Sequence, residues 1–291
     1  SISMAVIFPG KASHEVTVEN MFTDIEKLKV LVKRAAREEL LEAFGNSDFE
    51  YKEDGSVITP ADLAMQNRLE RDLKQHWPDY DILGEEMSEQ DQLQVISQAN
   101  AQDGGGYWCI DPLDGTSNYA ATIPFFAVSI ALIIDRKQYL GLIYDPVRDE
   151  MFTAIKGQGA FLNGQPLGNT SSLIPGNKPV IAEIDLKRLP KLLAVRLVSE
   201  KLFASQRNIG SSAIDWCWMA AGRFDIYLHG GQKMWDYAAG SLIFSEAGGY
   251  SVSLDNQPVF RGNLEVRSVL ASLRKDLFDD WHQWIKIPYK E

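Results

Sequence analysis

The apolar positions near the start of the chain follow the period of an α-helix. Between residues 21 and 45 apolar side chains recur at helical intervals, at Ile25, Leu28, Val32, Ala35 and Leu40. This pattern predicts an amphipathic helix that buries one face. Gly45 follows the last apolar positions and is the expected stop of the helix.

A second helix is predicted over residues 60–76. Thr59 is placed to cap it, and Pro60 suits its first helical position, where the missing N–H does no harm. The expected apolar face consists of Leu63, Leu69 and Leu73. Trp77 and Pro78 then end the pattern.

The middle of the chain changes to a β pattern. Two short apolar runs, DILGEE (81–86) and YWCID (107–111), predict buried strands whose C-terminal ends carry carboxylates. From Phe125 to Phe161 three runs rich in β-branched and aromatic residues are separated by turn residues: FFAVSIALII, YLGLIYD and EMFTAI. We expect them to form an antiparallel meander.

A stretch rich in Gly, Asn, Ser and Pro, residues 168–179, is the best candidate for a linker. Beyond it, predicted strands (PVIAEI and FDIYLH) alternate with predicted helices (LPKLLAVRLVSEKL, SSAIDWCWMAAG and WDYAAGSLIFSEAGG), as in an α/β layer. We therefore predict two tightly packed subdomains: an N-terminal α+β subdomain over 1–175 and a C-terminal α/β subdomain over 176–291.

Composition narrows the class of protein. The chain has 291 residues, 45% of them hydrophobic, which is enough for a large core. A net charge of -11 removes the broad basic surface that nucleic-acid phosphates require, so no nucleic-acid partner is expected. No apolar run approaches the roughly 18 residues of a membrane span, and the first residues do not resemble a signal peptide. Cys109 and Cys217 lie in apolar runs, so we expect two free core thiols and a cytoplasmic location.

The candidate chemistry begins with a pair of acids in the segment WCIDPLDGTSNYA. Asp111 and Asp114 can face one cation if the chain turns between them, and Pro112 and Gly115 favour such a turn. Magnesium prefers oxygen ligands of this kind. Taken alone, however, the pair is better explained by a loop with solvated acids than by a metal site.

Other polar residues of the candidate site also have ordinary structural explanations when each is taken alone. Glu85 and Glu86 follow a predicted strand, where surface charge is the ordinary explanation. Asp236 lies in the first turn of a predicted helix, which favours an acid in any case. Thr59 and Asp62 are explained by a capped helix. Together, these coincidences favour a shared site.

Four segments resemble, in their sequences and in their order along the chain, the inositol monophosphatase family of magnesium-dependent, lithium-sensitive phosphatases. The segments are GSVITPADLAMQNRLE, ILGEE, WCIDPLDGTSNY and WDYAAGSLIFSEAGG. The resemblance extends from about Lys52 to Gly249, and DPLDGT and WDYAAG are its most specific motifs. It implies a layered α-β-α-β-α sandwich of the sugar phosphatase type and a homodimer.

The resemblance also implies a metal site with two or three Mg²⁺ ions. The implied metal ligands are Glu85, Asp111, the backbone carbonyl of Leu113, Asp114 and Asp236, with Glu86 as a neighbour in the network. Metal ions supply the activation that a phosphatase needs, so water attacks the phosphorus without a covalent nucleophile.

Further roles are implied by the same resemblance. Glu85 and Thr116 position the attacking water, while Thr59 and Asp62 hold Thr116 through hydrogen bonds. The implied phosphate-binding residues are Gly115, Thr116 and Ser117.

Substrate selection in the family lies largely in NIGSSAIDW and just before the WD motif. The candidate substrate-binding residues are Gly210, Ser211, Ser212, His229 and Lys233. His229 stands where inositol phosphatases commonly carry a glutamate, so it and Lys233 leave two substrates open. Inositol 1-phosphate is favoured over a 3'(2'),5'-bisphosphate nucleotide. A non-catalytic regulatory protein on a phosphatase fold is the alternative of another class.

Overall fold

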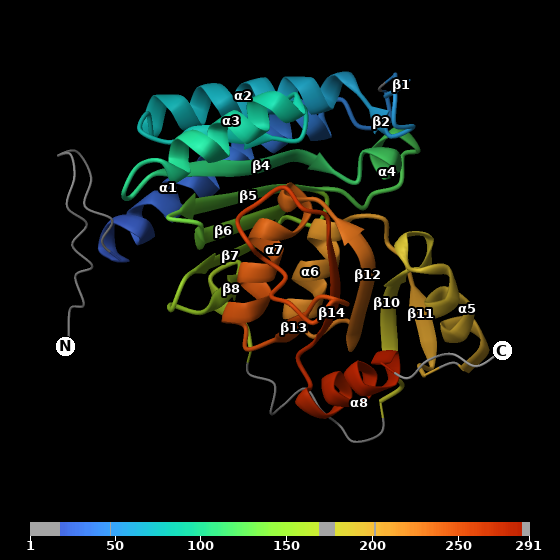
Figure 1. Cartoon of the computed structure of the whole chain (residues 1–291). Helices are drawn as coiled ribbons and strands as arrows, with labels where there is room; N and C mark the ends of the chain where they lie inside the picture. The colour runs from blue at the N-terminus through green and yellow to red at the C-terminus, as the bar shows by residue number, and fades with distance from the viewer. Residues whose placement is uncertain (1–17, 47, 169–177, 201, 287–291) are drawn as a thin grey trace.

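A computed structural model describes residues 18–46, 48–168, 178–200 and 202–286 (Figure 1). Its helices are α1 (Val18–Ala36), α2 (Pro60–His76), α3 (Glu89–Asn100), α4 (Thr116–Ala120), α5 (Lys191–Glu200), α6 (Ser212–Ala220), α7 (Met234–Glu246) and α8 (Lys275–Lys286). A π-helical turn, η1 (Arg37–Leu41), follows α1, and a 3-10 turn, η3 (Leu186–Arg188), precedes α5.

The longer strands are β3 (Asp81–Gly84), β4 (Gly106–Asp114), β5 (Ala127–Ile134), β6 (Lys137–Asp145), β7 (Glu150–Ile155), β10 (Ile181–Asp185), β12 (Ile226–Gln232) and β14 (Arg267–Ser272). The shorter strands are β1 (Glu50–Tyr51), β2 (Val57–Ile58), β8 (Ala160–Leu162), β9 (Gln165–Pro166), β11 (Ser205–Arg207) and β13 (Tyr250–Val252). They form a seven-stranded sheet, a five-stranded sheet and a β1–β2 hairpin.

The elements are stacked in five layers (Figure 1). Apolar residues of α1 and α2 pack on one face of the seven-stranded sheet, and those of α6 and α7 pack on its other face. The inner helices also contact the five-stranded sheet, whose far face is covered by α5 and α8. The predicted α-β-α-β-α sandwich is therefore confirmed.

The seven-stranded sheet has the order β3-β4-β5-β6-β7-β8-β9. Strands β5, β6 and β7 pair antiparallel in sequence order, which confirms the predicted meander. Among the strand pairs described for this sheet, only β3 and β4 are parallel, so the C-terminal ends of these two strands lie at the same edge. The acids that follow β3 are thereby brought beside those at the end of β4.

The five-stranded sheet has the order β11-β10-β12-β14-β13. Strands β10 and β12 are parallel and place Asp185 opposite His229. This register brings together two residues that are 44 positions apart: Asp185 is the last residue of β10, and His229 lies in the middle of β12.

The core confirms most of the predicted apolar positions. Every predicted core residue of the first helix is buried, and both cysteines are buried and free. The prediction for Leu63 is wrong: it is 49% exposed, because it lies on the face of α2 that is turned away from Leu69 and Leu73. No helix in the described ranges is long and apolar enough to cross a membrane. The proposed boundary near residue 175 falls at positions 169–177, outside the described residues, and the two-subdomain division stays a prediction.

Candidate active site

Three carboxylates from distant parts of the chain meet between the two sheets. Asp111 and Asp114 come from the end of β4, and Asp236 comes from the first turn of α7. One oxygen of each lies within 4.8 Å of the others. The pairing of β4 with β5 shifts register between the two β4 acids, and the Leu113 N–H donates to Asp111 Oδ1 at 3.0 Å. This local turn directs both β4 carboxylates toward one point.

Asp114 is fixed by the start of α6. Its Oδ2 atom accepts hydrogen bonds from the Ser211 hydroxyl and, at 2.9 Å, from the Ala213 N–H. Ser211 is also the N-cap of α6 and accepts the Ile214 N–H. With two donors on Oδ2, the other oxygen of Asp114 is left for a ligand.

Asp236 is fixed by the helix on which it lies. Its Oδ2 accepts the Lys233 N–H at 2.7 Å, an N-terminal capping bond of α7. The helix itself packs closely on α6: a Cβ on Gly240 would come within 2.4 Å of Trp216 Cβ. Only glycine fits at this crossing, so the α6–α7 contact sets the positions of Asp114 and Asp236 together.

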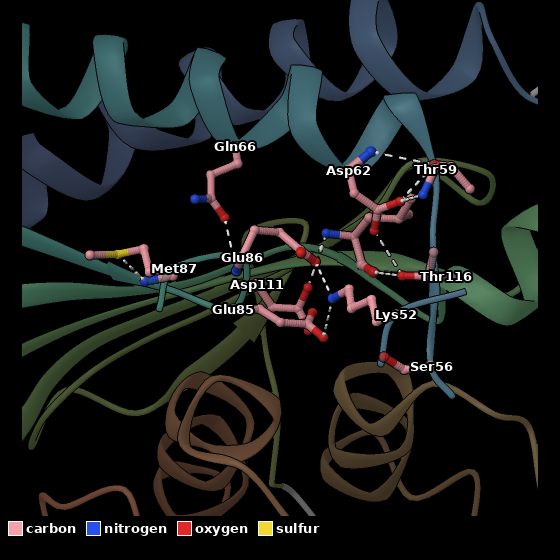
Figure 2. Close-up of polar contacts among 12 residues, drawn as sticks. Lys52, Ser56, Thr59, Asp62, Gln66, Glu85, Glu86, Met87, Asp111 and Thr116 are labelled. Atoms are coloured by element: carbon pink, nitrogen blue, oxygen red, sulfur yellow. Dashed lines mark hydrogen bonds and ion pairs between the residues drawn. The ribbon is translucent and has the colours of Figure 1, made fainter. Parts of the chain in front are cut away.

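Glu85 and Glu86 follow β3 and share a lysine (Figure 2). Lys52 Nζ lies 2.7 Å from Glu86 Oε1 and 3.6 Å from Glu85 Oε1. The Glu86 N–H donates to Gln66 Oε1 at 3.3 Å, which ties this turn to α2. Burial disfavours the charge of Lys52, but the two glutamates prevail and raise its pKa.

A chain of hydrogen bonds links the start of α2 to Thr116 (Figure 2). Thr59 and Asp62 form a capping box, in which Asp62 Oδ2 accepts from the Thr59 hydroxyl at 2.6 Å and from its N–H at 2.7 Å. The Thr116 hydroxyl lies 2.8 Å from Asp62 Oδ1 and 2.9 Å from the Leu113 carbonyl oxygen. The expected contacts among these residues are present, whereas their catalytic roles stay predictions.

The acids perturb one another strongly. Burial, together with the neighbouring carboxylates and against the effect of Lys52, raises the pKa of Glu85 to about 8. Burial and the charge of Asp114 raise the pKa of Asp236 to about 7. Burial raises the pKa of Asp114 to about 6, although Ser211 and Ala213 oppose the shift, and it raises the pKa of Asp111 well above its usual value.

These pKa shifts show that the protein alone does not balance the charge of its acids. A divalent cation would do so, and the converging atoms are hard carboxylate oxygens, the ligands that Mg²⁺ prefers. Asp111, Asp114 and Asp236 therefore form a group that fits a divalent metal ion.

The acids open into a cavity of about 200 Å³. Most of the predicted site residues line it, namely Glu85, Asp111, Leu113, Asp114, Gly115, Thr116, Ser117, Gly210, Ser211, Ser212, His229 and Asp236. Gly115 has a φ of 90°, and a Cβ there would lie 2.8 Å from the Phe125 carbonyl oxygen, so the turn before α4 requires glycine. Phosphate binding by Gly115, Thr116 and Ser117 stays a prediction.

Two of the predicted substrate-binding residues are placed less favourably for contact with a substrate in the cavity. His229 is buried, its Nδ1 accepts the Gly231 N–H at 3.0 Å, and its Nε2 lies 3.3 Å from Asp185 Oδ2. Lys233 is exposed, is not among the described residues that line the cavity, and lies 5.6 Å from the centre of the Trp235 ring. Their predicted substrate contacts stay predictions.

Several residues of the site escape motif analysis. Lys52, which contacts Glu85 and Glu86, is one of them. The others line the cavity and include Ser56, Asp185, Arg188, Asn208 and Asp215. Asp185 directly follows a predicted strand, but its position beside His229 depends on the pairing of β10 with β12, which is not local in sequence. Although burial opposes the charge of Asp185, the hydrogen bond and charge of His229 together with Arg188 hold the pKa of this carboxyl below its usual value.

Known proteins are similar to this chain in sequence and in fold. The sequence model of the inositol monophosphatase family matches residues 22–283. The chain is 30% identical over 226 residues to inositol monophosphatase 1 of Bos taurus (76% of this chain, 78% of the relative) and 34% identical over 249 residues to Nus factor SuhB of Escherichia coli K12 (81% and 86%).

Solved structures of inositol monophosphatases have a similar fold. The structure of SaIMPase-II with bound 2'AMP is 25% identical, has a TM-score of 0.71, and covers 90% of this chain and 93% of that one. Another structure of SaIMPase-II carries inositol monophosphate, with 25% identity, a TM-score of 0.70, and 90% and 92% coverage. The family match spans nearly the whole described chain, the bovine and bacterial relatives agree with it, and the fold is shared. The chain belongs to the inositol monophosphatase family.

Proposed function

We propose that this protein hydrolyses small phosphomonoesters to the alcohol and phosphate with Mg²⁺ as its cofactor. The convergence of Asp111, Asp114 and Asp236 within 4.8 Å, with Glu85 on the wall of the same cavity, supports the proposal most directly. When bound, two or three magnesium ions supply Lewis acidity to the phosphoryl group and to the attacking water. The membership of the family supports phosphatase chemistry in general.

Thr116 and Glu85 are proposed to orient the water. A hydroxyl has one proton, and that of Thr116 is directed at Asp62 Oδ1 or at the Leu113 carbonyl oxygen. Toward a third group the Thr116 oxygen can therefore act only as an acceptor, which suits a water that must present its lone pair to phosphorus. Thr59 and Asp62 keep Thr116 in this state, and Glu85 offers a second acceptor.

Inositol 1-phosphate is the proposed substrate. The support is the family itself, together with the inositol monophosphate found in SaIMPase-II. Gly115, Thr116 and Ser117 are proposed to hold the phosphate, while Gly210, Ser211 and Ser212 line the cavity beside it. Lithium sensitivity and a homodimer are proposed from the same resemblance, and a cytoplasmic location is proposed from the two free cysteines.

Two other functions have specific support. A bisphosphate nucleotide is the second substrate candidate, because SaIMPase-II also binds a nucleotide, 2'AMP. A regulatory role without catalysis is supported by the similarity to Nus factor SuhB. Against an exclusively regulatory role, every acid of the proposed metal site is present and placed in the cavity.

The experiment is phosphate release from inositol 1-phosphate, adenosine 3',5'-bisphosphate and fructose 1,6-bisphosphate, each with and without Mg²⁺ and lithium. The proposal expects magnesium-dependent, lithium-sensitive release from inositol 1-phosphate. If the wild-type protein releases phosphate from none of the three compounds with Mg²⁺ present, the proposed enzymatic function is wrong.

A further inference from the structure

The turn η3 places an arginine in the wall of the cavity that contains the proposed metal ligands. Arg188 is its last residue, has an exposed side chain, and lines the cavity that also contains Asp111, Asp114 and Asp236. Its positive charge acts on the acids of the cavity, since it lowers the pKa of both Asp185 and Asp236.

The main chain of Arg188 is fixed in two ways. Asp185 caps η3 by accepting the Lys187 N–H at 3.1 Å through Oδ1, and its Oδ2 lies 3.3 Å from His229 Nε2 on the neighbouring strand. In addition, a Cβ on Gly230 would come within 1.7 Å of the Arg188 carbonyl oxygen, so the turn lies directly against the backbone of β12. Only glycine permits this approach.

The side chain of Arg188, in contrast, is free. No hydrogen bond or ion pair of its guanidinium is found within the described residues, although five N–H donors are available. His229, the other basic residue of the cavity wall, has both ring nitrogens engaged, by Gly231 and by Asp185. A fixed backbone with an unpaired guanidinium is a prepared binding group for an anion, especially phosphate.

We infer that Arg188 is a specificity-determining residue that binds a second phosphate group on the alcohol part of the substrate. This inference rests on the proposed phosphatase function and extends it: inositol 1-phosphate is a substrate, and an ester with a second phosphate is a better one. The Asp185–His229 pair holds the turn in place.

The test compares two ligands that differ only in the second phosphate, adenosine 3'-phosphate and adenosine 3',5'-bisphosphate. Arg188→Gln should lower kcat/KM for the bisphosphate about tenfold to 100-fold, the range expected for a charge-assisted hydrogen bond, and change that for the monophosphate less than threefold. Gly230→Ala should produce the same selective loss in protein that remains folded, because it displaces the turn. The matched control is Lys187→Gln, which removes an exposed cation next to Arg188 but outside the cavity lining.

Calorimetric titration with each of the two ligands in the presence of Mg²⁺ distinguishes a failure of this inference from a failure of the proposed function. If the wild-type protein releases no phosphate, the proposed function fails, and a selective loss of bisphosphate binding in Arg188→Gln still supports the role of Arg188. Equal effects of Arg188→Gln on both ligands, no effect on either, or an equal loss in Lys187→Gln would each overturn it.

Discussion

The contact between Ser211 and Asp114 makes a sharp prediction about metal binding. Asp114 Oδ2 accepts two hydrogen bonds, from the Ser211 hydroxyl and the Ala213 N–H, and Ser211→Ala removes the first. Loss of a hydrogen-bonding partner of a metal ligand weakens metal affinity about tenfold to 100-fold. We therefore expect Mg²⁺ to bind Ser211→Ala less tightly by about 1.4 to 2.7 kcal/mol.

The same substitution also removes an N-cap, which needs its own control. Loss of a capping hydroxyl lowers the free energy of unfolding by about 0.5 to 2 kcal/mol. Ser88→Ala removes the N-cap of α3, an exposed serine that accepts the Asp91 N–H and is not among the described residues that line the cavity. Both variants should lose stability without metal, and only Ser211→Ala should lose Mg²⁺ affinity.

The assay is calorimetric titration with Mg²⁺, combined with guanidinium denaturation of the metal-free variants. The hydrogen bond from Ser211 lowers the pKa of Asp114 against the effect of burial, so its removal favours the protonated acid. The defect in Ser211→Ala should therefore be larger at pH 6 than at pH 8. Wild-type Mg²⁺ affinity in Ser211→Ala at both pH values would refute the claim that this hydroxyl positions Asp114.

Two further predictions follow from the acids and the helix crossing. Burial raises the pKa of Glu85 to about 8 and of Asp236 to about 7. An acid whose pKa is raised by folding stabilises the folded state at low pH, and this contribution is lost as the pH rises. The Tm of the metal-free protein should therefore fall between about pH 5 and 8.5. Saturating Mg²⁺ should abolish this fall in Tm. Gly240→Ala forces a Cβ against Trp216 and should lower the free energy of unfolding by about 1 to 3 kcal/mol in denaturation, whereas Ser245→Ala on the exposed side of α7 should change it by less than about 0.5 kcal/mol.

Either of these two results can be contradicted directly. A metal-free Tm that rises or stays constant over this pH range would show that the site acids are not held protonated by burial. Unchanged stability in Gly240→Ala would mean that α6 and α7 tolerate a larger separation than the structure has.

Local patterns were enough to predict the parts of the site that lie within single elements. Thr59, Pro60 and Asp62 are a capping box at the start of α2, and its side-chain contacts span only three residues. The acids at the ends of β3 and β4 were predictable because two apolar runs end in carboxylates. Leu63 was assigned wrongly, since a leucine on a helix can fit the helical period and still lie on the exposed face.

Contacts between distant segments could not be predicted in this way. Ser211 reaches Asp114 across 97 positions, and Lys52 reaches Glu86 across 34. Arg188 and Lys187 are adjacent exposed cations in the sequence, and only the packing of η3 against Gly230 distinguishes the one that lines the cavity. The register of two parallel strands determines this packing, and no short pattern encodes it.

The most direct test of the metal-dependent mechanism is phosphate release from inositol 1-phosphate by the wild-type protein and by Asp111→Asn. Asp111 is buried and repelled by its acidic neighbours, so its neutral isostere should fold with equal or higher metal-free stability. Its magnesium-dependent turnover should fall at least about 100-fold, since metal ions supply several kcal/mol to this chemistry. A folded Asp111→Asn protein that releases phosphate at the wild-type rate would contradict the assignment of these acids as the metal site.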